Sequence, residues 1–327
     1  MATQRKHIII DTDPGVDDAL ALILALRSDE LQVEAITTVN GNVCLSQCTE
    51  NALRILEILG LPEPPPVAQG ADRPLCREPL SSASIHGRDG LGEISILKDR
   101  SGKKKYPSPR LHPTAKYAPE LICDLAARHP RGLTIVTLGP LTNIALALTL
   151  EPALPRYVKE IVTMGGAYSA PGNVTPAAEF NFFCDPEAAQ QVIASGIPIT
   201  LVGLDVTRIA RLSRHSLLNA TKKRTRLNQF LQNATAHAMS FYCEREGYHG
   251  CSVHDALAMM VAIDSSFVGT KRVHVEVETE GKLTAGMSVA DLRPYSRGKA
   301  GKPNAAVALY VDPSRFEHFL LDRITDR

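Results

Sequence analysis

The sequence lacks several features that would narrow its function at once. It has no tryptophan among 327 residues, aromatic residues make up only 5% of it, and its longest apolar run is Ala19–Leu26. A run of that length is too short to span a bilayer, so we expect no membrane partner. Lysine plus arginine number 36 and aspartate plus glutamate number 35, which leaves a formal net charge of +1. That balance argues against a protein that binds nucleic acid by neutralising phosphates.

Cysteine motifs are also missing. The seven cysteines are odd in number, are spread along the chain and form no C-x-x-C pair. We interpret them as reduced thiols of a cytoplasmic protein rather than as a zinc or redox site. The absence of a charged and then apolar leader favours the same compartment.

Short β-branched runs alternate with longer segments of helical period along the chain. The runs that predict buried strands are His7–Ile10, Val33–Val39, Leu133–Leu138, Glu160–Met164 and Ile199–Leu204. The segments that predict helices are Asp17–Arg27, Ser46–Leu59, Thr142–Leu150 and Asp185–Ser195. This alternation is typical of the α/β class, with a Rossmann-like core in which helices cover both faces of a mostly parallel open sheet.

The second half of the chain departs from that alternation. A helical pattern extends from Ser213 to about Ile263, and two strand-like pieces follow it, Val273–Glu278 and Val307–Val311. A final helix is expected over Arg315–Ile324. No internal repeat or long linker divides the chain, so we expect a single domain over residues 1–327 with a helical insertion near the active site.

Unusual polar segments follow several of the expected strands. In chain order, these segments are Asp11–Asp18, Asn40–Asn42, Gly139–Asn143 and Met164–Asn181. In an open parallel sheet, ligands bind outside the carboxyl ends of the strands. We therefore expect these segments to converge on one rim of the sheet and to form one site there.

Four aspartates crowd the first of these segments, DTDPGVDD: Asp11, Asp13, Asp17 and Asp18. Carboxylates this close repel one another, and their pKa values rise unless positive charge lies among them. The segment contains no lysine or arginine, and a helix N-terminus supplies only partial charge. A bound divalent cation would supply enough, and oxygen ligands suit Ca²⁺ or Mg²⁺. Asp255, which opens a later helical run, is a candidate for a further ligand.

Plain structural interpretations compete with these functional ones. The two aspartates that open the first helix could simply cap it, although capping leaves Asp11 and Asp13 unexplained. His254 could be an ordinary hydrogen-bonded histidine, and His86 could belong to a plain turn. The polar residues after Met164 could cap loops and form turns.

Taken in order, the motifs resemble those of the inosine–uridine-preferring nucleoside hydrolases. DTDPGVDD after an apolar strand is similar to the signature of that family. Further blocks are similar to family blocks in the family's order: Asn40–Asn42, Leu138–Asn143, Met164–Gly166, Gly172–Asn181, Asp185–Ala189 and His254–Asp255. The resemblance covers roughly residues 6–325 and implies the nucleoside hydrolase fold.

The resemblance also implies a reaction, a cofactor and a set of site residues. The reaction is hydrolysis of the N-glycosidic bond of purine or pyrimidine ribonucleosides to ribose and free base, in nucleoside salvage. The cofactor is one Ca²⁺ per subunit. By position, its ligands are Asp13, Asp18, Asp255 and the main-chain carbonyl of Leu138. The positions that correspond to substrate contacts are Asp17, Asn42, His86, Met164, Asn173, Glu179, Asn181, Tyr242 and Asp255.

The residue types suit that chemistry. Glycosidic cleavage passes through an oxocarbenium-like sugar, whose positive charge is stabilised by carboxylates and amide oxygens. A bound Ca²⁺ holds two ribose hydroxyls and lowers the pKa of a water, from which Asp13 takes the proton as general base. His254 resembles the family histidine near the base and is the expected proton donor, with His86 and Tyr242 as candidate helpers.

Several alternatives stay open. The absence of tryptophan excludes an indole that stacks on the base, and we expect broad or pyrimidine-leaning specificity. The resemblance implies a homotetramer or a dimer. A metal-dependent phosphatase would use Asp11 as nucleophile, but its D-x-D motif lacks the threonine expected after it. A non-catalytic nucleoside binder would keep the fold, although every proposed catalytic carboxylate is present.

Overall fold

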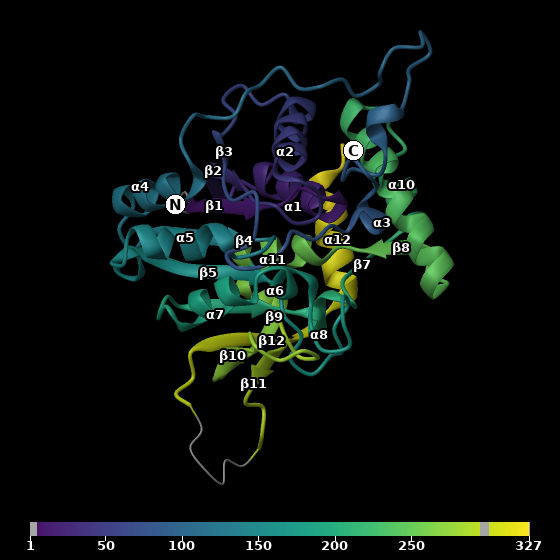
Figure 1. Ribbon diagram of the computed structural model, residues 1–327. Helices are drawn as coiled ribbons and strands as arrows, with labels where there is room; N and C mark the ends of the chain where they lie inside the picture. The colour runs from purple at the N-terminus through teal and green to yellow at the C-terminus, as the bar shows by residue number, and fades with distance from the viewer. Residues whose placement is uncertain (1–4, 295–300, 327) are drawn as a thin grey trace.

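The computed structural model describes residues 5–294 and 301–326, and an eight-stranded sheet forms its centre (Figure 1). Its strands are β1 (Lys6–Thr12), β2 (Leu31–Thr38), β3 (Val67–Gln69), β4 (Leu133–Thr137), β5 (Val158–Met164), β6 (Ile199–Val202), β9 (Val268–Val273) and β12 (Ala305–Val311). They lie in the order β3-β2-β1-β4-β5-β6-β12-β9. Every neighbouring pair is parallel except β12 and β9. The predicted mostly parallel sheet is therefore confirmed.

Helices cover both faces of the sheet, as the alternating pattern predicted. The first hydrophobic core contains residues of α1 (Val16–Leu26), α2 (Leu45–Leu59), α10 (Arg226–Glu246), α11 (His254–Ile263) and α12 (Pro313–Ile324). The second contains residues of α4 (Ala118–Arg128), α5 (Thr142–Leu150) and α7 (Pro186–Ala194). Successive residues of β1 divide between the two cores, because Ile8 and Ile10 belong to the first and Ile9 to the second.

The remaining elements are short. Two small antiparallel sheets pair β7 (Arg211–Ser213) with β8 (Gly250–Ser252) and β10 (Val275–Val277) with β11 (Ser288–Ala290). The short helices are α3 (Ala83–His86), α6 (Phe180–Cys184), α8 (Leu204–Thr207) and α9 (Arg214–Ala220). Single 3₁₀ turns occur at Ile94–Ile96, Leu154–Arg156 and Ser265–Phe267. Among the described residues, no helix is long and apolar enough to cross a membrane.

Two sequence predictions needed correction in the second half of the chain. The helical region expected from Ser213 to Ile263 is interrupted by β8, whose three residues are too few to show a strand period. The strand expected over Val273–Glu278 is divided between β9 and β10. The middle of β9 is polar and exposed because this strand lies at the edge of the sheet, so the hydrophobic pattern did not mark it.

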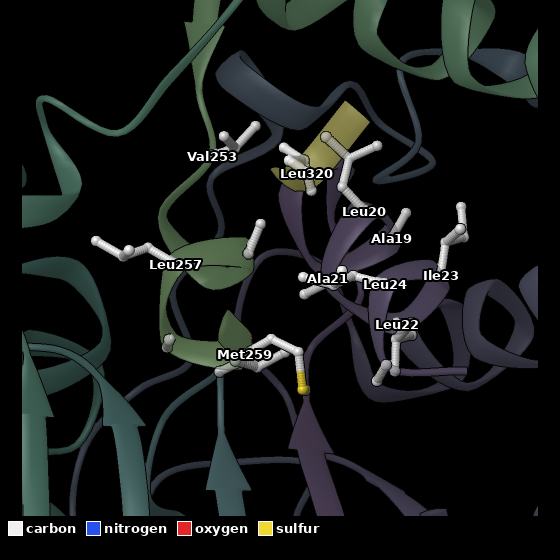
Figure 2. Close-up of a cluster of buried hydrophobic side chains, with 14 of the residues drawn as sticks. Ala19, Leu20, Ala21, Leu22, Ile23, Leu24, Val253, Leu257, Met259 and Leu320 are labelled. Atoms are coloured by element: carbon white, nitrogen blue, oxygen red, sulfur yellow. The ribbon is translucent and has the colours of Figure 1, made fainter. Parts of the chain in front are cut away.

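The packing of α1 against α11 determines where the site forms. Figure 2 shows Met259 of α11 near Ala21 and Leu24 of α1, and Leu320 of α12 next to Leu20. α1 is apolar on nearly every face because it is buried on nearly every face. The first turns of two helices that are far apart in sequence are thereby held next to each other.

Candidate active site

Aspartates from α1 and α11 meet at the carboxyl ends of the central strands. Asp17 and Asp18 lie in the first turn of α1, and Asp255 lies in the first turn of α11. One carboxylate oxygen from each of the three lies within 4.8 Å of the others. Acidic residues are favourable in the first turn of a helix, but capping alone does not require three of them to converge.

Three hydrogen bonds hold Asp18 in place. Thr12 Oγ1 donates to its Oδ1 over 2.5 Å, and the backbone N–H of Gly15 donates to its Oδ2 over 2.9 Å. The side-chain amide of Asn42 donates to the same Oδ2 over 3.0 Å. These donors come from the last residue of β1 and from the turns that follow β1 and β2, so the sheet itself fixes the orientation of this carboxylate.

Asp13 is fully buried, and only one of its two carboxylate oxygens has a hydrogen-bond partner. Its Oδ2 accepts the backbone N–H of Asn42 over 2.7 Å, whereas its buried Oδ1 has no hydrogen-bond partner. Gly41 and Gly139 approach this carboxylate so closely that a side chain at either position would collide with it. A buried acceptor without a donor calls for an explanation, and a bound cation is one.

The electrostatics of the cluster also fit a cation. Burial raises the pKa values of Asp13, Asp18 and Asp255, and repulsion from neighbouring carboxylates raises them further. No hydrogen bond to these carboxylates within residues 5–294 and 301–326 comes from a lysine or arginine. Crowded carboxylates of this kind suit a hard divalent cation with oxygen ligands.

Asp11 lies in a separate buried network. Its Oδ1 accepts from Thr37 Oγ1 over 2.6 Å and from the Asn143 amide over 2.7 Å, and its Oδ2 has no partner. Burial raises its pKa to about 7. Asp11 is fully buried and two side chains already donate to its Oδ1, an environment that fits a supporting residue better than the nucleophile of the phosphatase interpretation. Sequence reasoning quoted Asn143 in a motif but gave it no role.

A cavity of about 820 Å³ opens over the acidic cluster. All the sequence-predicted site residues line it except Asp13 and Asp18, which are fully buried: Asp17, Asn42, His86, Leu138, Met164, Asn173, Glu179, Asn181, Tyr242, His254 and Asp255. The cavity wall therefore brings together residues from positions 17 to 255 of the chain. A cavity of this size can enclose a nucleoside-sized ligand.

Polar groups gather at one side of the cavity. The side-chain amide of Asn181 donates to the Leu138 carbonyl over 2.7 Å and to the Met164 carbonyl over 3.2 Å, which joins the ends of β4 and β5. Glu179 caps α6 and accepts backbone N–H groups of Gly166 and Asn181 over 3.0 and 2.9 Å. Burial raises the pKa of Glu179 to about 7 despite these bonds.

Asn173 belongs to the same side. Its Oδ1 accepts the backbone N–H of Phe180 over 2.9 Å, so it also stabilises the loop in which it lies. Asn173 and Glu179 therefore both stabilise the local backbone and line the cavity.

Two histidines and a tyrosine also line the cavity. His86 Nδ1 accepts the backbone N–H of Val16 over 3.0 Å, so any ring proton is on Nε2. His254 Nδ1 lies 2.8 Å from Thr207 Oγ1. Burial lowers the pKa of His86 to about 4 and lowers the pKa of His254 as well. Burial raises the pKa of the Tyr242 hydroxyl.

The cavity also has lining residues that sequence reasoning missed. Arg211 donates to Glu246 over 2.7 Å, which ties β7 to the end of α10 at the cavity. Arg208 donates to the carbonyl of Gly172 over 2.6 Å, and Phe241 adds an aromatic ring. Arg211 lies in a three-residue strand, Arg208 at the end of a short helix and Phe241 in a polar helix. The sequence signal for these residues was therefore weak.

Comparison with known proteins identifies the family. The model for the family described as inosine-uridine preferring nucleoside hydrolase matches residues 8–318. The chain belongs to this family. Nucleoside hydrolases are enzymes that act on the N-glycosidic bonds of ribonucleosides, and the family match and the relatives below support that reaction class for this chain.

Relatives agree over nearly the whole chain. The chain is 37% identical to the inosine-uridine preferring nucleoside hydrolase of Crithidia fasciculata, with 98% of this chain and 97% of that one aligned. It is 38% identical to the pyrimidine-specific ribonucleoside hydrolase RihA of Salmonella gallinarum, with 97% of each aligned. Among solved structures, the plant nucleoside hydrolase PpNRh1 matches with a TM-score of 0.89 at 33% identity, over 99% of this chain and 100% of that one.

Proposed function

We propose that the enzyme hydrolyses ribonucleosides with the help of one Ca²⁺ and that Asp13 is its general base. The observation that carries the proposal is the buried, unpartnered Oδ1 of Asp13, whose carboxylate is repelled by those of Asp17 and Asp18 in the acidic cluster at the cavity. A carboxylate with a free oxygen is suited to accept a proton from water.

The residues that would hold the cation are Asp13, Asp18, Asp255 and the carbonyl oxygen of Leu138. All four offer oxygen, which favours Ca²⁺ or Mg²⁺ over zinc, and the resemblance to the family favours Ca²⁺ of the two. When bound, such a cation lowers the pKa of a water and supplies a contact for two sugar hydroxyls.

The protein's own residues would orient the sugar. Asp17, Asn181 and Asp255 line the cavity next to the acidic cluster, and we assign them to the ribose 2′- and 3′-hydroxyls. Asn173 and Glu179 lie on the polar side and would bind the 5′-hydroxyl, while Asn42 and Met164 would line the sugar site. Asp13 would then remove a proton from water as its oxygen attacks the anomeric carbon.

Departure of the base needs a proton donor. His254 is our choice, because the contact of its Nδ1 with Thr207 leaves Nε2 available to the cavity. Its lowered pKa favours the neutral imidazole in the free enzyme. His86 and Tyr242 line the same cavity and would assist in binding the base.

The base preference is broad or pyrimidine-leaning in our proposal. The named relatives include an inosine-uridine preferring enzyme and a pyrimidine-specific one, and the lining residues Phe241 and Tyr242 could stack on either type of base. We further propose that residues 1–327 form one domain, in a homotetramer or dimer. Its role would be nucleoside salvage in the cytoplasm, which the seven unpaired cysteines support.

Ribose release from inosine, adenosine, guanosine, uridine and cytidine tests the function. The purified enzyme would be assayed before and after removal of metal and again after readdition of Ca²⁺. We expect release that is lost with the metal and restored by Ca²⁺, and the rank order of substrates gives the base preference. A folded protein with Ca²⁺ that binds inosine or uridine without releasing ribose would instead be a binder.

A further inference from the structure

A second group of metal-ligating side chains lies away from the active site. It consists of His7 in β1, Glu34 in β2 and His129, the residue that ends α4. His7 Nδ1 lies 2.7 Å from Glu34 Oε1, and His129 Nε2 lies 3.8 Å from Glu34 Oε2. One ligand atom from each residue lies within 4.8 Å of the others. His7 stands near the start of β1, whereas Asp13 follows the end of that strand, so the two sites lie at opposite ends of the strands.

A β-bulge places Glu34 in this cluster. Along the β1–β2 ladder, Ile8 pairs with Val33 and Ile9 pairs with Ala35, so the ladder passes over Glu34. Ala35 belongs to the buried core that also contains residues of α4 and α5, and Glu34 extends its carboxylate to one nitrogen of each imidazole. Bulges redirect side chains, and they are common next to functional sites.

The connection from α4 to β4 places His129 against His7. The connection turns back tightly, because Gly132 donates its backbone N–H to the carbonyl of His129 over 2.8 Å. Arg131 takes the left-handed conformation with φ 61°, although it is not glycine. A strained backbone of this kind persists only where its surroundings enforce it, and it often marks a functional position.

We propose that His7, Glu34 and His129 form a binding site for a transition-metal cation such as Zn²⁺, Ni²⁺ or Cu²⁺. Imidazole nitrogens select these cations over Ca²⁺ and Mg²⁺, which prefer oxygen ligands. The three side chains are only partly exposed, with side-chain exposures of 33%, 21% and 26%, so part of the coordination sphere is open to water.

Binding requires two local changes. The neutral imidazole of His7 must carry its proton on Nε2, which frees the Nδ1 lone pair that now faces Glu34. The rings of His7 and His129 stack with centroids 4.4 Å apart, and they must turn out of this stack so that both nitrogens face the cation. The competing interpretation is that His7 and Glu34 only contact each other as an imidazole–carboxylate pair and bind no cation.

The cation would join three segments that the chain separates by up to 122 positions: β1, the bulge of β2 and the end of α4. It would therefore stabilise the folded state against unfolding without contacting the nucleoside. Removal of an outer partner of a ligand lowers metal affinity by ~10- to 100-fold, so removal of a ligand should cost at least as much.

The test compares wild type with His129→Gln, His7→Gln and Glu34→Gln, and with His112→Gln as a control at an exposed histidine. Zn²⁺ binding would be measured by calorimetry with Ca²⁺ in saturating excess to occupy the acidic cluster. The thermal unfolding midpoint would be recorded with and without Zn²⁺, and Cu²⁺ spectra would be recorded by electron paramagnetic resonance.

We expect wild type and His112→Gln to bind one Zn²⁺ that the three site variants bind at least ~10-fold more weakly. Cu²⁺ should show hyperfine coupling to two nitrogens in wild type and to one in His129→Gln. The Zn²⁺-dependent rise in the unfolding midpoint should disappear in that variant. Equal Zn²⁺ affinity in wild type and in all site variants would overturn the proposal, as would nitrogen coupling that His129→Gln leaves unchanged.

Discussion

Asn42 donates its backbone N–H to Oδ2 of Asp13 over 2.7 Å, which leaves Oδ1 as the only oxygen of that carboxylate without a partner. The side-chain amide of the same asparagine donates to Asp18 over 3.0 Å. One residue from the loop after β2 thus orients two carboxylates at once.

Asp13→Asn should nearly abolish turnover. The amide keeps the size of the side chain but cannot accept a proton, and loss of a general base costs ~10²- to 10⁴-fold. Steady-state rates on inosine and uridine measure the effect, with exposed Asp99→Asn as the control. Activity within tenfold of wild type would show that Asp13 is not the base.

His254→Ala should affect substrates unequally. Nucleosides with poor leaving groups should lose ~10²-fold or more in kcat/KM, because their bases leave only with a proton. p-Nitrophenyl riboside, whose leaving group departs without protonation, should lose only a few-fold. Exposed His215→Ala serves as the control. Equal losses on both kinds of substrate would assign the proton to another donor.

Asp255→Asn should have opposite effects on stability with and without Ca²⁺. Repulsion from Asp17 and Asp18 contributes to the raised pKa of Asp255, so removal of its charge should stabilise the metal-free protein. The same change removes a proposed ligand. At a Ca²⁺ concentration 100 times the dissociation constant, wild type should gain about 2.7 kcal/mol in free energy of unfolding. Urea denaturation with and without Ca²⁺ would measure both effects, and an undiminished gain in the variant would remove Asp255 from the ligand set.

Glu179 should make the stability of the protein depend on pH. Burial raises its pKa from 4.5 to about 7, so across that window the folded chain binds a proton that the unfolded chain does not. The contribution of Glu179 to the free energy of unfolding is complete below about pH 4.5 and falls as pH rises toward 7, by on the order of 3 kcal/mol.

The measurement for Glu179 is urea denaturation at several pH values in saturating Ca²⁺. We expect the stability difference between wild type and Glu179→Gln to shrink or reverse as pH rises through that window. Parallel pH profiles for the two proteins would mean that the Glu179 carboxyl is ionised throughout.

The fold was predictable where several residues carry the same periodic signal. The helix predicted over Thr142–Leu150 has those bounds in the structure, and Asp185 caps α7 as its Asp-Pro sequence indicated. β8 was missed because three residues show no period, and β9 because an edge strand has little to bury.

The candidate site also contains residues that the sequence marked and residues that it did not. The aspartates were found because like charges crowded into one short segment need an explanation. Asp255 was only a candidate from its place at the start of a helical run, and the resemblance assigned it to the metal; the contact between α1 and α11 that joins residues more than 200 positions apart left no pattern of its own. The bulge at Glu34 and the Arg211–Glu246 pair left no sequence signal, because each depends on which strands or helices become neighbours.

The contact between α1 and α11 also has a consequence for folding. Asp18 belongs to the first helix of the chain and Asp255 to the eleventh, so the acidic cluster exists only after both have packed on the same core. Contacts across so long a separation form late and slowly. A chain released from the ribosome before α11 would carry the DTDPGVDD segment but lack the aspartate and histidine that complete the cavity. Turnover of a nucleoside would therefore report that folding had reached the last third of the chain.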